Sequence, residues 1–503
     1  MDQSIGFVRM AVAILVEATA CTGTSESDEA LSPREPAPSP PSRVAGELRQ
    51  YAEALTREYG FSGSVLVARG NLVLLADGFG YADDADRLPV TAETRFPIAS
   101  ATKPLTATAV LLLEEAGRLR LAEPICTKVA PCPRRWRSIR IVDLLDQSAG
   151  LPDLPAASLD RPLMEVIDDL RDEPLLFPPG TDYTYSNSNY LLAGAIVEQA
   201  SGMPWERFLR TKVFEPAGMT HTISDTDPKA QRDPVVGYST SLSPIGDRVP
   251  VTARLTRRMG HATPDPSPAG GLLSTAGDLL AFVRFLDRGA LLSPLTLDRM
   301  WTPRGPSRFA DYGLGWERIH QNGTWVAQHG GAMPGFSSCV SLYPREDVYV
   351  LVLSNLGETV ACEYVGRDLG AIVFGEPYRV PRAPSGTWVS PRTLRRYSGV
   401  YRPDVELSEE EVQVMVEGSR LVLRRVPAPA PGLNRESVLQ PWSPTTFFNP
   451  HDPAVRISFR RIRNTINMIF HRPAYKRLPP SWERWTKSPE EPPSPTELGG
   501  EGL

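Results

Sequence analysis

Several signatures of metal, nucleotide and nucleic-acid proteins are missing from this sequence of 503 residues. It contains no HExxH, no GxxxxGK[ST], and its six histidines form no ligand cluster. Metal and nucleotide chemistry are therefore unsupported, and we expect neither a metal nor a cofactor. The net charge of −5 and the lack of a basic run argue against nucleic acid as a partner. A GxSxG elbow is also absent, so no α/β-hydrolase serine is indicated.

Long apolar runs are absent as well, and none reaches the roughly 18 residues needed to cross a bilayer. The short run MAVAILV follows Arg9 and precedes EATAC, which ends at Cys21. Small residues before a cysteine resemble a bacterial lipoprotein signal, in which Cys21 is acylated after cleavage. We therefore expect an exported envelope protein, periplasmic, lipid-anchored or secreted, that meets a membrane only through that lipid. The alternative is a disordered N-terminal tail.

Cysteine is rare, with five residues in the chain. Cys126 and Cys132 lie in CTKVAPC, close enough to pair in an oxidising compartment. Their spacing is too long for a CxxC redox or zinc motif. A disulfide between them is a hypothesis that thiol titration of the exported protein can test.

Proline is abundant, with 50 residues that gather toward the two ends of the chain. Such polar, Pro-rich ends cannot bury enough apolar surface to fold. A shift of composition at RVPRAPSGTWVSP (379–391) marks a boundary between two folded parts. The predicted division is a signal segment (1–21), a disordered tether (22–43), a main domain (44–378), a β-domain (388–478) and a disordered tail (479–503).

The main domain has strand patterns at both ends and helical patterns between them. Residues 62–83 predict a hairpin that turns at Gly70, and strand patterns return at 324–344 and 347–357. We therefore expect an antiparallel sheet built from both ends of the domain and flanked by helices, an α/β or α+β class. Further helices are predicted at 47–60, 190–202, 274–289 and 358–374, and strands of the small domain at 397–401, 412–426 and 454–470.

Lysine is scarce, because six lysines stand against 48 arginines, yet Lys103 follows Ser100 by three residues in FPIASATKPLTATAVLLLEEAG. Arginine stays protonated in proteins, whereas a buried lysine can lose its proton. Position 103 therefore indicates a need for an amine that titrates. Residues i and i+3 share a helix face, so the Ser100 hydroxyl can contact the Lys103 amine. Taken alone, the pattern favours a helix-start serine beside a surface lysine.

A second stretch, PPGTDYTYSNSNYLLAGAIVEQASG (178–202), places Tyr185 and Asn187 just before an apolar helix. A tyrosine can act as a general base where a cation such as Lys103 lowers its pKa. The asparagine offers amide donors and an acceptor to a substrate. A capped helix start with a packed aromatic ring explains this stretch equally well in isolation.

A third stretch, QHGGAMPGF, places His329 and two glycines, Gly330 and Gly331, on or beside a strand. Glycines in a strand let a substrate backbone approach closely. The backbone N–H of Ala332 can complete an oxyanion hole with that of Ser100. A glycine turn between strands is the alternative explanation.

In this order and spacing, the three stretches resemble the serine β-lactamase and penicillin-recognising family. The most similar branch holds class C β-lactamases, serine D-alanyl-D-alanine carboxypeptidases and β-lactamase-like esterases. The resemblance covers about 47–375 and implies a β-lactamase/transpeptidase-like fold, and the C-terminal part is similar to a small β-domain often appended to such proteins. Other family-like stretches are LLDQSAGLP (144–152), GMPWERFLRTKVFEPAGMTHT (202–222), PAGGLLSTAGDLLAF (268–282) and YGLGW (312–316).

The resemblance implies an acyl-enzyme mechanism without a cofactor. Ser100 would be the nucleophile, Lys103 would help to deprotonate it, and Tyr185 would relay protons as base and then as acid. Asn187 would orient a substrate amide, and His329 would stand at the third motif.

Three positions depart from the family pattern. The third motif is often Lys-Thr-Gly, whose cation and hydroxyl hold a substrate carboxylate. Here His329 is expected to be charged only part of the time near neutral pH, and Gly330 has no hydroxyl. This lowers the expectation of efficient β-lactam hydrolysis. Gln147 replaces a common histidine, which we assign to loop packing.

The predicted function is a serine hydrolase of amides or esters, D-Ala-D-Ala carboxypeptidase-like or esterase-like, with β-lactam hydrolysis as a further option. Its substrate would be a small molecule or a peptide of cell-wall type. The alternative is a non-catalytic binding or structural module of the envelope that keeps the penicillin-binding fold.

Overall fold

The structure is a computed structural model of the chain. In the described part of the chain, no helix is both long and apolar enough to span a bilayer. The predicted signal segment with Cys21 lies outside the described residues. These are residues 41–154, 162–231, 235–239, 249–251, 267–357, 362–382, 387–403, 411–426, 436–449, 452–462, 465–471 and 484–487.

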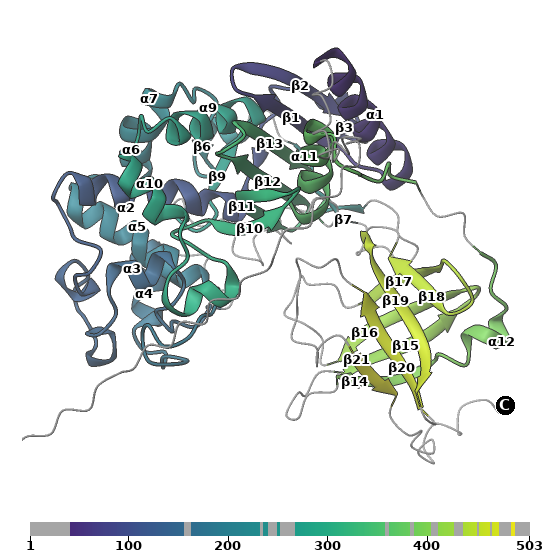
Figure 1. Cartoon of the computed structure of the whole chain (residues 1–503). Helices are drawn as coiled ribbons and strands as arrows, with labels where there is room; N and C mark the ends of the chain where they lie inside the picture. Colours follow the sequence, from purple (N-terminus) through teal and green to yellow (C-terminus); the bar gives the residue numbers. More distant parts are fainter. Residues whose placement is uncertain are drawn as a thin grey trace, which may run out of the picture. The chain divides into compact units, whose positions relative to one another are not determined.

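A six-stranded antiparallel sheet forms the centre of the main domain, in the order β10-β11-β12-β13-β1-β2 (Figure 1). Strands β1 and β2 form the predicted hairpin, and β13 pairs with β1 from Gly63↔Ser354 to Arg69↔Val348. The two ends of the domain therefore share one sheet, as the sequence predicts. The strands are β1 (Gly63–Arg69), β2 (Leu72–Phe79), β10 (Glu317–Gln321), β11 (Thr324–Met333), β12 (Phe336–Tyr343) and β13 (Val348–Ser354).

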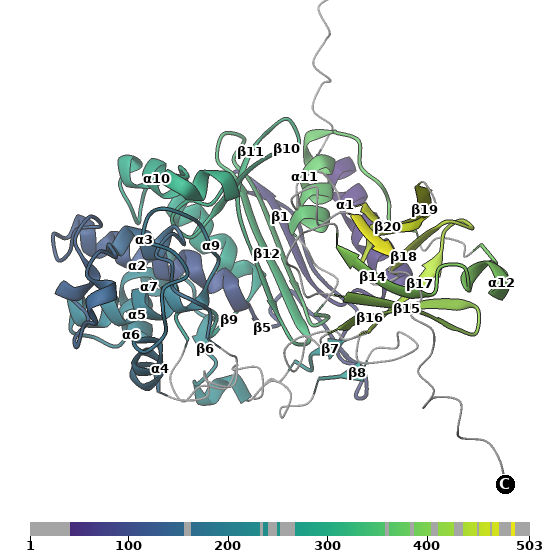
Figure 2. The ribbon, with the colours of Figure 1, turned by 90° about the horizontal axis from the view of Figure 1, so that it is seen from below.

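Helices cover both faces of this sheet (Figure 2). The valines at 348, 350 and 352 of β13 join a core with α1 (Pro41–Tyr59) and α11 (Arg367–Phe374). The residues between them join the larger core with the other helices. A strand buried on both faces gives a continuous apolar run, which is why VYVLVL lacks polar alternation. The helices of the larger core include α2 (Lys103–Glu115), α3 (Ile141–Leu145), α4 (Leu163–Leu170), α5 (Asn187–Ser201), α6 (Trp205–Leu209), α9 (Ala276–Asp287) and α10 (Pro294–Trp301).

Several predicted element boundaries are wrong. Helix α1 begins at Pro41, inside the predicted tether. The helix predicted at 358–374 is a π-helix, η8 (Cys362–Gly366), followed by α11, and residues 358–361 lie outside the described residues. Helix α2 is buried almost all round, because it crosses the middle of the larger core.

Two disulfides cross-link the main domain. Cys126 pairs with Cys132, with Cα atoms 5.4 Å apart. Cys339 on β12 pairs with Cys362 on η8, with Cα atoms 4.9 Å apart. The second pair was not predicted, because 23 residues separate its members and pairing cannot be deduced from sequence alone.

The predicted C-terminal β-domain is confirmed as eight antiparallel strands, β14 to β21, that close into a barrel in chain order. Apolar side chains such as Leu421, Phe447 and Phe459 fill its interior. The predicted end at residue 478 is wrong, because β21 pairs with β14 and β20. The strands are β14 (Gly399–Pro403), β15 (Glu411–Glu417), β16 (Arg420–Val426), β17 (Glu436–Pro441), β18 (Thr446–Asn449), β19 (Asp452–Ile462), β20 (Thr465–His471) and β21 (Arg484–Lys487).

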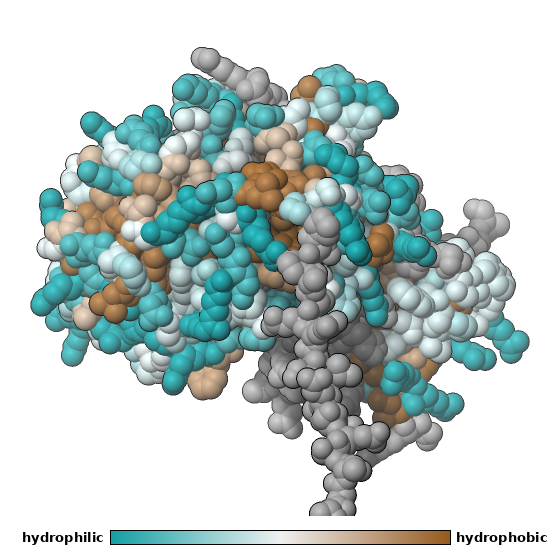
Figure 3. All heavy atoms as spheres, turned by 45° about the horizontal axis from the view of Figure 1, so that its top comes forward, coloured by the Kyte–Doolittle hydropathy of each residue, from teal (hydrophilic) through white to brown (hydrophobic). Residues whose placement is uncertain are grey.

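Polar residues cover much of the face shown in Figure 3, and hydrophobic residues gather there in smaller groups. Scattered apolar side chains of this kind are normal for a folded protein surface. Among the described residues, the most exposed large apolar side chains are Phe309, Trp388 and Leu295.

Candidate active site

Ser100 lies in a 3-10 turn, η1 (Ala99–Thr102), that runs directly into α2. Side chains three residues apart eclipse each other in this geometry, and Lys103 Nζ lies 2.9 Å from Ser100 Oγ. Ala99, just before the serine, has a φ of +46°, which is uncommon for a residue with a side chain. The serine is half-buried and the lysine is fully buried.

Strand β11 packs against this turn at Gly331. A Cβ atom added there would lie 2.1 Å from the carbonyl oxygen of Ile98, so only glycine permits the approach. Ser338 of the neighbouring strand donates to the same oxygen at 2.7 Å. Gly330 has room for a Cβ, which would meet its nearest neighbour at 3.8 Å. The close approach brings the HGGA stretch to the serine.

The same strand continues beyond its pairing with β10, which ends at Glu317↔Gln328. Residues from His329 to Met333 therefore extend past β10 beside the serine turn, and Ala332 there is exposed. This is the position at which the sequence predicts backbone contacts to a substrate. The oxyanion-hole role of Ala332 stays a prediction.

The amine of Lys103 has two further oxygen partners, Asn187 Oδ1 at 2.8 Å and the carbonyl of Ala269 at 2.9 Å. Burial lowers the pKa of Lys103 to about 7, although the charge of Asp153 acts in the opposite direction. A neutral amine has two N–H groups, which these two oxygens accept. Its lone pair then faces the Ser100 hydroxyl, so the arrangement suits a base.

Tyr185 lies beside Lys103 and Ser100. The centre of its ring is 4.8 Å from Lys103 Nζ, and its hydroxyl forms a hydrogen bond with Ser100. The side chain is 39% exposed, but the surrounding protein still removes enough water to raise its pKa. The hydrogen bond to Ser100 lowers that pKa, whereas the charges of Glu317 and Asp153 raise it further. The interpretation that Lys103 lowers the pKa of Tyr185 is therefore wrong. The phenol keeps its proton near neutral pH, and the group that can lose one is the lysine.

Gln147 holds the loop that carries Tyr185. Its carbonyl accepts the N–H of Thr184 at 3.1 Å, and its side-chain Oε1 accepts the N–H of Ser186 at 3.0 Å. The two bonds bracket the tyrosine. Gln147 is fully buried and has a φ of +64°, and its Oε1 also accepts from Asn189 Nδ2. The residue thus packs a loop, as the sequence predicts, and that loop belongs to the site.

His329 is buried and both its ring nitrogens have partners. Nδ1 lies 2.7 Å from the carbonyl oxygen of Gly330, so Nδ1 carries the proton and donates it. Nε2 then accepts from the hydroxyl of Tyr312 at 3.0 Å. Burial lowers the pKa of His329 to about 3, so the expectation of partial charge near neutral pH is wrong. The side chain is neutral there and supplies no cation for a substrate carboxylate.

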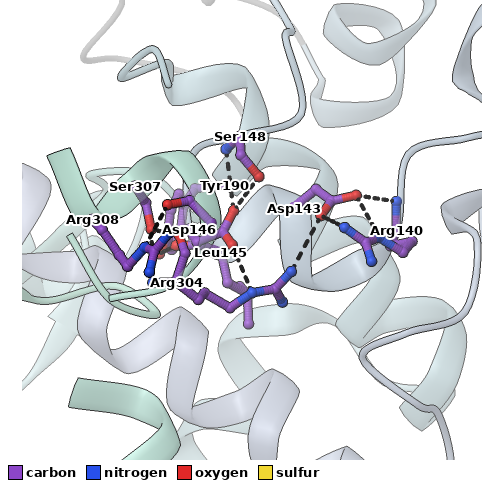
Figure 4. A network of polar contacts seen from close by, with 10 residues as sticks. Arg140, Asp143, Leu145, Asp146, Ser148, Tyr190, Arg304, Ser307 and Arg308 are labelled. Atoms are coloured by element: carbon purple, nitrogen blue, oxygen red, sulfur yellow. Dashed lines mark hydrogen bonds and ion pairs between the residues drawn. The ribbon is translucent and has the colours of Figure 1, made fainter. Parts of the chain in front are cut away.

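A polar network anchors the loop that follows α3 (Figure 4). The hydroxyl of Tyr190 on α5 donates to the carbonyl of Leu145 at 2.9 Å. The adjacent Asp146 accepts from Ser148 Oγ at 2.6 Å and lies 3.4 Å from Arg304 Nε. Burial raises the pKa of Asp146 to about 6, despite the opposing charge of Arg304. The network ties α3, α5 and the segment around Arg304 together next to the site.

The structure thus brings the side chains of Ser100, Lys103, Tyr185 and Asn187 into one cluster beside His329. Their chemical roles stay predictions. Among the described residues, no group of three His, Cys, Asp or Glu side chains is arranged to hold a metal ion.

Sequence reasoning missed three participants. Ala269 acts through its backbone carbonyl, which no side-chain pattern reveals. Tyr312 and Asp153 lie in or next to family-like stretches, YGLGW and LLDQSAGLP, to which no role was given. The resemblance to the family therefore pointed to these two stretches, but it gave no chemical role to Tyr312 or Asp153.

Comparison with known proteins gives concordant matches. A family model described as Beta-lactamase matches residues 48–372. Penicillin-binding protein 4* of Bacillus subtilis (strain 168) is 28% identical over 397 residues, which is 75% of this chain and 86% of that protein.

Two solved structures extend these similarities. An octameric penicillin-binding protein homologue from Pyrococcus abyssi has a TM-score of 0.59 at 23% identity, and the match covers 88% of this chain and 99% of that one. A D-amino acid amidase from Ochrobactrum anthropi, in complex with D-phenylalanine, has a TM-score of 0.56 at 23% identity. This match covers 66% of this chain and 98% of that one. At this identity the likeness concerns the fold.

Proposed function

The chain belongs to the beta-lactamase family, and on that basis we propose that it is a serine hydrolase that forms an acyl-enzyme at Ser100. The observation that carries the proposal is the 2.9 Å contact between Ser100 Oγ and Lys103 Nζ. Burial holds the pKa of that amine at about 7, so a fraction of it is neutral and can take the serine proton at physiological pH.

The reaction would run in two halves. Ser100 Oγ attacks the carbonyl carbon of an amide or ester while its proton passes to Lys103 Nζ. The oxyanion that forms would be stabilised by the N–H groups of Ser100 and Ala332. When the carbonyl re-forms, the bond to the leaving group breaks, and that group takes the proton from Lys103 through the hydroxyl of Tyr185. A water molecule then attacks the acyl carbonyl and gives a proton to Lys103. When the carbonyl re-forms, the bond to Ser100 Oγ breaks, Oγ takes that proton back from Lys103, and the acid is released.

The charges at the site favour substrates without a carboxylate beside the reacting bond. His329 is neutral, and the charges that act on Tyr185 are the carboxylates of Glu317 and Asp153. We therefore place D-amino-acid amides or peptides and small esters ahead of D-Ala-D-Ala carboxypeptidase substrates and β-lactams.

Covalent labelling tests the proposal most directly. Purified protein is treated with a fluorescent fluorophosphonate and with a fluorescent penicillin, and Ser100→Ala is treated in parallel. We expect the fluorophosphonate signal to vanish in Ser100→Ala and to persist in Ser201→Ala, at the other end of α5. Label retained in Ser100→Ala would refute the nucleophile. Absence of label from the unchanged protein with either probe would favour the non-catalytic module.

Turnover then ranks the substrate classes. Initial rates are compared for a D-amino-acid amide, a p-nitrophenyl ester, an acyl-D-Ala-D-Ala peptide and a chromogenic cephalosporin. We expect the first two to be hydrolysed faster, and methylation of the peptide carboxylate to raise its rate. Fastest turnover of the free-acid peptide would contradict the order given above.

We propose further that the protein is exported to the bacterial envelope. Disulfides persist in oxidising compartments, and the structure has two of them in the main domain. These use four of the five cysteines and leave Cys21, in the segment that resembles a lipoprotein signal. Mass spectrometry of the N-terminal peptide from a membrane fraction tests this, because a lipid on Cys21 is expected. Full-length protein with free thiols in the cytoplasmic fraction would refute it.

A further inference from the structure

The side-chain amide of Asn187 makes two contacts of opposite kind. Its Oδ1 accepts from Lys103 Nζ at 2.8 Å, and its Nδ2 donates to Asp153 Oδ2 at 3.2 Å. The other carboxylate oxygen of Asp153 accepts the backbone N–H of Asn187 at 2.9 Å. A carboxylate can only accept hydrogen bonds, so it selects the nitrogen end of the amide and turns the oxygen end toward the lysine.

We propose that Asp153 is a positioning residue that orients Asn187 and, through it, the amine of Lys103. This inference rests on the proposed function. If the amide were reversed, Asn187 Nδ2 would face the N–H groups of the lysine, and two donors would meet. The lysine would then lose one of the two acceptors that direct its lone pair to Ser100.

Asp153 also supplies a charge to the site. Three other titratable groups face Lys103, namely the ring of Tyr185 at 4.8 Å, the ring of Tyr190 at 5.7 Å, and His329 on β11. Burial raises the pKa of both tyrosines and lowers that of the histidine, so all three are neutral near pH 7. The charge of Asp153 raises the pKa of Lys103. Removal of that charge should therefore let the lysine lose its proton at a lower pH.

The backbone around Asp153 is held independently of its carboxylate. The carbonyl of Pro152 accepts from Ser186 Oγ at 3.1 Å and from Ser188 Oγ at 2.7 Å. The side chain of Asp153 is itself exposed. A substitution at 153 should therefore remove the carboxylate and leave the loop in place.

The experiment measures the rate constant for fluorophosphonate labelling of Ser100 as a function of pH. A neutral probe avoids direct attraction or repulsion between the substrate and residue 153. We expect Asp153→Ala to lower the high-pH plateau of this rate constant at least tenfold, because misplacement of a catalytic group by about 1 Å can slow a reaction a hundredfold. We also expect the midpoint of the pH profile, which reports the titration of Lys103, to fall by about one pH unit, the usual effect of one neighbouring charge.

Two further variants separate orientation from charge. Asp153→Asn keeps an acceptor oxygen without the charge, so it should regain most of the plateau while the midpoint stays low. Asp182→Ala is the matched control, because this exposed carboxylate accepts only from the N–H of Tyr183 among the bonds described for it, and it should leave both quantities unchanged.

A plateau loss below about fivefold in Asp153→Ala, or a midpoint that does not move down, would overturn the proposal. So would an Asp153→Asn plateau no higher than that of Asp153→Ala. Each of these results is independent of Ser100→Ala, whose loss of label reports on the proposed function alone. The two can therefore fail separately.

Discussion

Lys103 is a buried lysine whose amine contacts three oxygen atoms, those of Ser100, Asn187 and Ala269. Burial disfavours the charged amine and lowers its pKa to about 7. An arginine in the same place would keep its proton and could not accept one from the serine. Under the proposed mechanism, this difference explains a lysine in a chain where most basic positions are arginine.

The pH dependence of turnover follows from that pKa. As pH rises through about 7, Lys103 loses its proton, so kcat/KM for a neutral ester should rise and then level off. Lys103→Arg should lower kcat/KM by about 10²- to 10⁴-fold, the usual contribution of a general base. Lys212→Arg, at an exposed position, is the control. A flat profile across neutral pH, or an active Lys103→Arg variant, would contradict this assignment.

The two glycines of the HGG stretch should differ in their tolerance of a side chain. Gly331→Ala would drive a Cβ to 2.1 Å from the Ile98 carbonyl, so it should cost about 1–3 kcal/mol or more of stability. Gly330→Ala has ordinary contacts at 3.8 Å and 4.0 Å and should cost less than about 1 kcal/mol. Urea denaturation of both variants measures the difference. Equal losses would show that β11 does not approach the serine turn as described.

At this scale, the SxxK spacing predicted that Ser100 and Lys103 can touch, and the resemblance to the family predicted that Tyr185 and Asn187 join them. Protonation could not be predicted, because it depends on burial. The pKa of Tyr185 is raised and that of His329 falls to about 3 because protein surrounds both rings. The role of Ala269 was also hidden, since any residue type offers the same carbonyl.

Helix α5 shows how one element positions two parts of the site. It begins at Asn187, and at Gly194 it lets Pro268 approach so closely that an added Cβ would lie 2.1 Å from Pro268 Cγ. Thr106 of α2 donates to the Pro268 carbonyl at 2.7 Å. The next residue, Ala269, then presents its carbonyl to the lysine.

Gly194→Ala should therefore lower both stability and the rate of serine labelling, because it pushes Pro268 and the neighbouring Ala269 away from α5. The matched control is Gly46→Ala in α1, where no atom lies within 4 Å of an added Cβ. That change should stabilise the helix by up to about 1 kcal/mol and leave labelling unchanged. Thermal unfolding and labelling rates measure both effects. A neutral Gly194→Ala would argue against this packing.

Periodicity predicted elements well where burial has a simple pattern. The β1–β2 hairpin and the doubly buried β13 are examples. It failed where few residues carry the pattern, as in the four-residue β21, which completes the barrel from within a stretch assigned to a tail. It also could not show that α2 is buried all round, because a mixed Thr/Ala/Leu helix suits one-sided or complete burial.

The disulfides act on the stability of the whole main domain. Cys339–Cys362 closes a longer loop than Cys126–Cys132, with sequence separations of 23 and 6. Cross-linking a longer loop restricts the unfolded chain more. Removal of Cys339–Cys362 should therefore cost about 3 kcal/mol, and removal of Cys126–Cys132 should cost less. Thermal unfolding of the two double alanine variants, with and without reductant, measures this. A larger loss from the Cys126 and Cys132 variant would contradict the loop-length argument.

The pairing of β1 with β13 has a consequence for the protein while the ribosome is still synthesising it. Gly63 cannot meet its partner until the ribosome has added Ser354. At about 5–20 residues per second, a nascent chain waits on the order of a quarter of a minute to a minute with β1 paired to β2 on one edge and its other edge still unpaired. During that interval chaperones can bind the open edge. If the protein is exported as proposed, a secretion channel that threads only extended polypeptide can also receive the chain before lasting tertiary structure forms.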